Sequence, residues 1–210
     1  MADNADLVFT PAARAEQEAR GSAKAYAQRV AEGFPNTVSE ELARFIALQD
    51  TAFLGTVSGA GAPYIQHRGG PTGFIKVLDE RTLGFADFRG NRQYITLGNL
   101  SENDRAFLFL LDAARRQRVK LWGRARVVDD DPDLLARLVD VGYKARPERA
   151  ILFTIDAWDS NCSSHIVTRF SEADIAEAMA TVQQTIGALQ QENARLRALL
   201  AEKTTSEPQE

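Results

Sequence analysis

The sequence predicts a mainly β fold, a six- or seven-stranded antiparallel barrel with N-terminal helices and a long C-terminal helix. Short apolar runs alternate with tight polar turns between residues 51 and 158, as in sheets of sequentially adjacent strands. Residues before and after this region have helical composition and periodicity. The 210 residues, 44% hydrophobic and 26% charged, suffice for one barrel domain with extensions.

Two helices are expected before the barrel. The stretch from Pro11 to Ala31 is rich in Ala, Glu and Arg, with an interruption at Gly21, and Pro35 ends it. Thr37 to Glu40 has capping-box spacing, so a second helix is expected over 38–49. Residues 1–36 therefore form an N-terminal extension in this interpretation.

The predicted strands occupy most of the middle of the chain. Arg105–Leu111 is almost continuously apolar, which favours burial on both faces, whereas Arg118–Val128 alternates and has one face in the core. Short helices are expected over Gln93–Leu100 and after Asp131, the N-cap before Pro132. The other expected strands are Thr51–Ser58, Pro63–His67, a hairpin of Phe74–Leu78 with Thr82–Phe88, and Ala150–Trp158.

The C-terminal helix carries a heptad repeat. It begins with a capping-box pattern at Ser171, and its apolar residues recur three and four apart over three heptads. Asn193 falls at an a position, where a buried Asn favours a parallel pair. The helix forms either an intermolecular coiled coil or a layer on its own barrel. The expected domains are 1–36, the barrel 37–170, the helix 171–203 and a disordered tail 204–210.

Composition and missing motifs exclude several function classes. The net charge of −4 does not favour nucleic-acid binding, and no apolar run is long enough to span a membrane. A single cysteine and the lack of a signal peptide indicate a cytoplasmic protein. The Gly-x-Ser-x-Gly elbow, the Gly-x-Gly-x-x-Gly fingerprint and the Walker loop are absent. Cys162 and His165 alone do not make a metal site.

A local cluster of positive charge is the main functional signal. Arg side chains offer a fork of donors that matches phosphate oxygens, and glycine lets the backbone approach a ligand. The turn Arg89–Arg92 precedes a helix, whose N-terminus favours an anion. In the Arg68 turn, Gly69 and Gly70 allow positive φ. The basic residues are Arg68, Lys76, Arg89, Arg92, Arg116, Arg118 and Lys120.

The segments GFADFRGNRQY, NLSENDRAFLFLLD and RVKLWGRARVVD resemble the FMN-binding split β-barrel family related to pyridoxamine 5'-phosphate oxidase, in its flavin-nucleotide-binding branch of unassigned substrate. The resemblance covers about residues 38–169. It implies an FMN held between two subunits of a homodimer. Lys76 and the turn Asn91-Arg92-Gln93 match the residues that grip the phosphate. Gln93 stands where the oxidase has Lys, and Arg68 or Arg89 could replace that charge.

The resemblance also implies residues near the flavin ring. Ala86 and Asp87 match a strand end that touches the isoalloxazine, and the strand of Arg118 and Lys120 reaches the ring. Trp122 either stacks near the flavin or fills the dimer interface. The complete implied FMN set is Arg68, Gly69, Lys76, Ala86, Asp87, Arg89, Gly90, Asn91, Arg92, Gln93, Arg116, Arg118, Lys120 and Trp122.

Asn161, Cys162 and His165 follow the last strand and form a candidate substrate pocket. The Arg-x-His element of the oxidase is absent there, which argues against pyridoxamine phosphate as substrate. The expected function is an FMN-dependent oxidoreductase acting on a small molecule or taking hydride from a reduced nucleotide. The alternative is a non-catalytic flavin carrier or sensor dimer, which the missing general acid or base and the long helix favour. A barrel that has lost its cofactor is a third reading, supported only by Gln93.

Overall fold

The computed structural model describes residues 4–161 and 164–205. The chain divides into two compact units between residues 166 and 167, a barrel unit and a helical unit, and each is described by itself. The predicted barrel and the N-terminal helices lie in the first unit. The second unit contains the long C-terminal helix.

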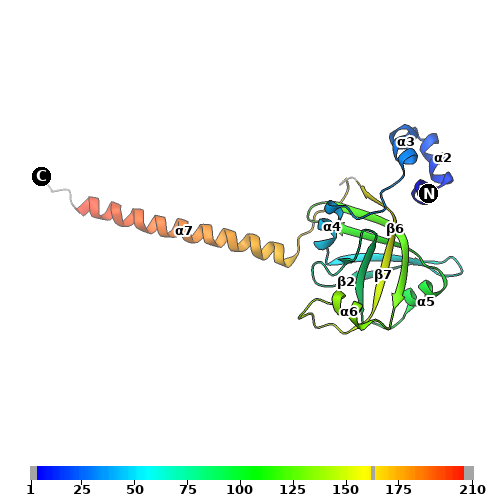
Figure 1. The fold of residues 1–210 in the computed structure, drawn as a ribbon. Helices are drawn as coiled ribbons and strands as arrows, with labels where there is room; N and C mark the ends of the chain where they lie inside the picture. The colour runs from blue at the N-terminus through cyan, green and yellow to red at the C-terminus, as the bar shows by residue number, and fades with distance from the viewer. Residues whose placement is uncertain (1–3, 162–163, 206–210) are drawn as a thin grey trace. The chain divides into compact units, whose positions relative to one another are not determined.

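The barrel unit is built on one seven-stranded sheet, which confirms the predicted fold class (Figure 1). The strand order is β2-β1-β5-β6-β7-β4-β3, and every neighbouring pair is antiparallel. β2 and β3 are therefore the two edges. The strands are β1 Thr51–Val57, β2 Pro63–Gly69, β3 Lys76–Val77, β4 Thr82–Phe88, β5 Arg105–Asp112, β6 Gln117–Val128 and β7 Pro147–Asn161.

The core lies on the inner face of this sheet. Leu54, Leu108, Leu121 and Phe153 are fully buried, each from a different strand. β5 alternates between buried and half-buried residues, so the prediction that both of its faces are buried is wrong. An antiparallel sheet that curls around its core encloses only one face, and the apolar residues on the other face of β5, Phe107, Phe109 and Leu111, are half-buried.

Short helices precede the sheet in the chain and connect some of its strands. α4 begins after Ser39, whose hydroxyl accepts from the Leu42 N–H at 3.1 Å, so the N-cap is Ser39 rather than Thr37. Gly21 adopts a φ of 73° and separates α2 from α3, as the sequence indicated. The helices of the barrel unit are α1 Ala5–Val8, α2 Pro11–Ala19, α3 Ala23–Glu32, α4 Glu40–Ala47, α5 Ile95–Glu102 and α6 Pro132–Leu138. The sequence did not predict α1.

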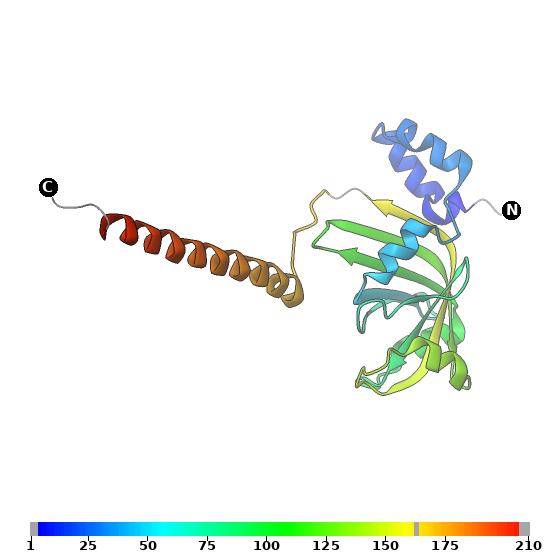
Figure 2. The ribbon, with the colours of Figure 1, turned by 60° about the vertical axis from the view of Figure 1, so that its left-hand side comes forward.

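The Asn4 side chain holds the N-terminal helices to the barrel. Its amide donates to the carbonyl oxygens of Phe34 at 2.7 Å and Asp156 at 3.0 Å, and its oxygen accepts from the Phe34 N–H at 2.9 Å. Phe9 packs edge-on against Tyr26 and Phe34. Figure 2 shows α2 and α3 as neighbouring helices in this extension.

The helical unit contains α7, Glu172–Thr205. Ser171 and Asp174 form the predicted capping box: the Asp174 N–H donates to Ser171 Oγ at 3.1 Å, and the Ser171 N–H donates to Asp174 Oδ2 at 2.9 Å. Within the described residues, no helix combines the length and apolar character that crossing a membrane requires.

Candidate functional site

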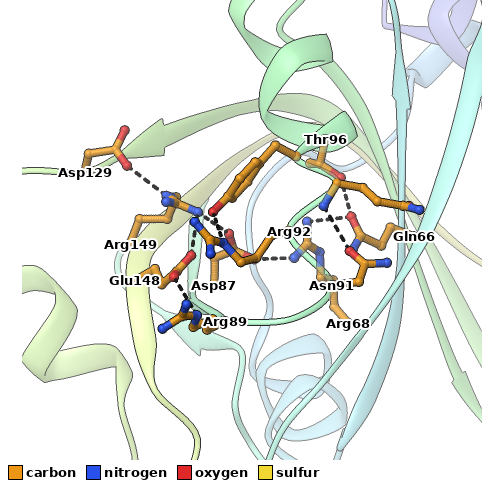
Figure 3. A network of polar contacts seen from close by, with 12 residues as sticks. Gln66, Arg68, Asp87, Arg89, Asn91, Arg92, Thr96, Asp129, Glu148 and Arg149 are labelled. Atoms are coloured by element: carbon orange, nitrogen blue, oxygen red, sulfur yellow. Dashed lines mark hydrogen bonds and ion pairs between the residues drawn. The ribbon is translucent and has the colours of Figure 1, made fainter.

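Arginine side chains from β2, β7 and the turn before α5 gather around Asp87 of β4 (Figure 3). Arg68 on β2 forms an ion pair with Asp87 on β4, and Arg149 on β7 reaches the same carboxylate at 3.2 Å. No backbone ladder joins β2 to β3 or β4 in the described sheet, so this ion pair links β2 to β4 through side chains. We call Arg68, Asp87, Arg92 and Arg149 the arginine cluster.

Arg68 is the most enclosed cation of the cluster, with its side chain 11% exposed. Its Nη1 donates to Asp87 Oδ1 and its Nη2 donates to Gln66 Oε1 at 3.1 Å. Its Nε is buried and has no hydrogen-bond partner among the described residues. A buried donor without a partner is costly, so this N–H is suited to an acceptor supplied from outside the chain.

Arg149 belongs to the cluster, although the sequence analysis did not single it out. Its Nε donates to Asp129 at 2.8 Å, and its guanidinium lies 5.6 Å from the centre of the Tyr94 ring. Burial lowers the pKa of Arg149, but the hydrogen bonds to Asp129 and Asp87 outweigh burial and raise it overall. The register of β4 against β7 places Arg149 directly opposite Asp87. This register was not readable from the sequence.

The turn before α5 presents a second cation. Arg92 and Tyr94 adopt φ values of 61° and 56°, which non-glycine residues rarely do. Arg92 Nε donates to the Tyr94 hydroxyl at 3.0 Å, and this hydrogen bond raises the pKa of Arg92. Arg92 is exposed and forms no ion pair within the described part of the chain. Two conformationally restricted residues thus hold a solvent-facing guanidinium at the start of a helix.

The neighbouring residues of this turn are also near the cluster. Asn91 Oδ1 accepts from the Gln93 N–H at 3.2 Å, and Arg89 lies 3.8 Å from Glu148. α5 begins at Ile95, two residues later than predicted, and its N-cap Tyr94 provides no side-chain cap. The N–H groups of the first turn of α5 are therefore not capped by that side chain.

The glycines near the cluster have a different role from the one expected. Neither Gly69 nor Gly70 has positive φ, so the turn does not use the conformational freedom that these glycines allow. A Cβ on Gly70 would lie 2.6 Å from Phe74 Cβ, so close packing requires this glycine. A Cβ on Gly90 would meet no atom within 4 Å, which leaves the backbone of the Arg89–Arg92 turn open to a ligand.

Lys76 and Ala86 lie on the opposite face of β4 from Asp87. Successive strand residues alternate between faces, so Gly84 and Ala86 share one face of β4 and Asp87 lies on the other. Lys76 pairs with Gly84, and a Cβ on Gly84 would meet Leu138 of α6 at 3.0 Å, so this face is the one that α6 covers. Lys76 Nζ pairs with Asp140 at 2.7 Å, and Ala86 is buried beside Leu138. Within one chain, the structure does not bring these two residues into the arginine cluster.

The predicted residues on β6 form a third group, on the outer face of the sheet. Lys120 Nζ lies 3.5 Å from Asp159 and 5.1 Å from the centre of the Trp122 ring. Trp122 packs edge-on against Phe107 and lines a groove of about 1010 Å³ between this face and the N-terminal helices. Arg118 is on the same strand, and Arg116 lies in the turn before it with a φ of 56°.

The candidate substrate pocket is only partly described. Cys162 lies outside the described residues, and Asn161 is described only as the last residue of β7, paired with Arg118. His165 is exposed, with a φ of 63°.

Solved structures with similar folds were found. A protein from Clostridium acetobutylicum, related to general stress protein 26 of Bacillus subtilis and placed in the pyridoxine phosphate oxidase family, is 16% identical, covering 64% of this chain and 94% of that chain with a TM-score of 0.44. An FMN-binding protein from Syntrophomonas wolfei is 14% identical, covering 69% and 97%, with a TM-score of 0.47. The heme storage protein HutZ of Vibrio cholerae is 12% identical, covering 58% and 93%, with a TM-score of 0.40.

The comparison with protein families shows to which family residues 38–162 belong. No curated protein matches the chain at a significant level. The family model for pyridoxamine 5'-phosphate oxidase matches residues 38–162, which is more than half of the 210 residues. This match covers α4, all seven strands and the arginine cluster, and confirms the resemblance inferred from the sequence. The chain belongs to the pyridoxamine 5'-phosphate oxidase family.

Proposed function

We propose that this chain is a cytoplasmic FMN-binding flavoprotein and an oxidoreductase that acts, as a homodimer, on a small molecule. The observation that carries this proposal is the arginine cluster. It combines a buried Arg68 N–H without a partner and an exposed Arg92 without an ion pair. Both are donors suited to phosphate oxygens, and both lie in the segment matched by the family model.

The phosphate of FMN would lie at the turn before α5. Arg92, the Asn91 backbone N–H and the first N–H groups of α5 supply donors, and the open space beside Gly90 allows close approach. Arg68 supplies the charge that Gln93 lacks. Asp87 holds Arg68 and Arg149 in place, so the cations are oriented before the anion arrives.

The remaining predicted residues would act from the second subunit of the dimer. Lys76, Arg116, Arg118, Lys120 and Trp122 are not part of the arginine cluster within one chain. A site that used all of them therefore needs two chains, which agrees with an FMN held between subunits. Lys120 and Trp122 would then face the flavin ring, where a positive charge stabilises an anionic ligand.

Bound FMN would supply hydride or electron transfer through its isoalloxazine ring. The protein residues would bind, orient and shield it. Asn161, Cys162 and His165 are the proposed substrate pocket, for a small molecule or a reduced nucleotide donor. The absence of an Arg-x-His element near Trp158 still argues against pyridoxamine phosphate.

A second candidate function is a flavin carrier or sensor that does not turn over. The long α7, with a row of exposed apolar residues, favours it because a catalytic barrel does not need such a helix. Addition of NADH or NADPH to the purified flavoprotein separates the two. Bleaching of the flavin spectrum supports the oxidoreductase, and an unchanged spectrum with both nucleotides supports the carrier.

The test of flavin binding is the visible spectrum of the purified protein, with Arg92→Ala as the variant. Loss of one charge-assisted hydrogen bond costs about 1.5–3 kcal/mol, or roughly a 10- to 150-fold weaker FMN affinity by fluorescence titration. Arg44→Ala, an exposed arginine on α4 whose Nη1 lies 3.6 Å from Glu40, is the matched control and should bind FMN normally. An Arg92→Ala protein with a full flavin complement would contradict the phosphate assignment.

A further inference from the structure

The face of α7 that carries the heptad residues is exposed. Its a positions are Met179, Ile186, Asn193 and Leu200. Its d positions are Ile175, Val182, Leu189 and Leu196. The apolar members of this face are 49–65% exposed. A single stripe of this width, repeating every seven residues, matches the seam of a two-stranded coiled coil rather than the wider face of a helix that covers a core.

The surface of α7 has a hollow at the centre of this stripe. It is lined by Ile186, Leu189, Gln190 and Asn193, with Ala194 and Arg197 beside them. The first four are consecutive a, d, e and a positions. Four residues in these positions form the hole that receives a d-position side chain in knobs-into-holes packing. The hollow therefore fits Leu189 of a second, parallel and in-register copy of α7.

Polar residues along the seam select the same arrangement. Asn193 can face an identical amide only when two copies run parallel in register, because an antiparallel pair places it against an apolar residue. Glu192 at a g position precedes Arg197, the e position five residues later, so the two charges meet across a parallel pair. In the single chain Glu192 lies 3.7 Å from Arg195, a c-position residue on the outer side of the helix, so pairing of two copies would replace this contact with Arg197 of the second copy.

We propose that α7 pairs with α7 of a second copy as a parallel, in-register coiled coil centred on the Leu189 and Asn193 layers. Its 34 residues would span about 51 Å. This pair joins two chains independently of the barrel and of FMN. It holds the two barrels at a high effective concentration, so a barrel dimer with a weak interface of its own persists on dilution.

Cysteine cross-linking of the full chain tests the register. In a Cys162→Ser background, Leu196→Cys places a thiol at a d position, and Ala198→Cys places one at the f position on the far side of the same helix. With oxidised glutathione, we expect the Leu196→Cys protein to form a covalent dimer at least about tenfold faster, because paired thiols have a high effective concentration. The readout is a non-reducing gel and does not depend on flavin.

The outcomes separate the possible arrangements. Equal rates for the two variants, or no covalent dimer for Leu196→Cys, overturn the proposal. Slow cross-linking of Leu196→Cys alone but fast cross-linking when it is mixed with Met179→Cys, the a position that lies beside it in an antiparallel pair, shows an antiparallel pair and also overturns the proposal. As a second measurement, Glu192→Arg should slow Leu196→Cys cross-linking, and adding Arg197→Glu should restore the rate. Loss without restoration argues against the parallel register.

Discussion

Asp87→Asn tests whether the arginine cluster is a structural link as well as a ligand site. Asp87 accepts from Arg68 and Arg149, and the three side chains are only 8%, 11% and 14% exposed. The substitution keeps the shape of the side chain but removes the only charge that both guanidiniums share. The expected result is a large loss of stability in the flavin-free protein.

The magnitude follows from the geometry. Two unit charges about 4 Å apart attract by about 4 kcal/mol at an effective dielectric constant of about 20. Desolvation offsets much of the sum of two such pairs, and breaking a buried pair costs about 3–5 kcal/mol in practice. Arg68 keeps Gln66 and Arg149 keeps Asp129, so we expect a loss of about 4 kcal/mol. For a unit of this size, that lowers Tm by roughly 8–16 °C.

The assay is urea unfolding of flavin-free protein, followed by the fluorescence of Trp122 and Trp158, together with thermal melting. Asp129→Asn is the matched control, because Asp129 pairs with the same Arg149 but its side chain is 60% exposed. An exposed pair contributes about 0–1 kcal/mol. Equal losses for the two variants, or a loss below about 1 kcal/mol for Asp87→Asn, would refute the reasoning.

Three further predictions concern the barrel unit. Gly123→Ala should prevent correct folding, because a Cβ there would lie 2.0 Å from the Thr154 carbonyl oxygen. Gly90→Ala is the control and should fold normally, because a Cβ there would meet no atom within 4 Å. Soluble yield and circular dichroism of the two variants are compared. Asn4→Ala should release the N-terminal helices and speed their proteolysis, and an unchanged cleavage rate would show that other contacts hold them. The pKa of Asp79 lies below its ordinary value of 3.8 because the Arg81 N–H donates to its carboxylate. The carboxylate therefore stabilises the fold above about pH 4, so the stability difference between Asp79→Asn and the natural chain should narrow as pH falls through the lowered pKa in acid titration.

Much of the fold was predictable because its signals are local. Period-two alternation identified β6, and Asp131 before Pro132 identified the start of α6, where the Asp131 carboxylate accepts from the Leu134 N–H at 2.8 Å. These signals act within a few residues of one another. β5 was misjudged because its apolar run does not say which face lies in the core. That depends on how the sheet curls, which is set by strands far along the chain.

The candidate site was predictable only in part, for the same reason. The turn at Arg92 stands out in the sequence as basic residues beside a glycine. Arg149 does not, because its role depends on lying opposite Asp87, 62 residues earlier. Nor did the sequence show that Lys76 is on the other face of β4, paired with Asp140. Counting positive charges reveals a cluster, but pairing with acidic residues decides which cations remain available.

The Arg68–Asp87 ion pair joins β2 to β4 through side-chain charges, whereas backbone hydrogen bonds join the other neighbouring strands of the barrel wall. Backbone ladders respond little to ionic strength or to a neighbouring anion, but an ion pair responds to both. An anion that binds Arg68 Nε would share this guanidinium with Asp87, which accepts from Nη1, so ligand occupancy and closure of the wall are thermodynamically linked. The part of the barrel that binds the anion would then also be the first part to open when the ionic strength rises.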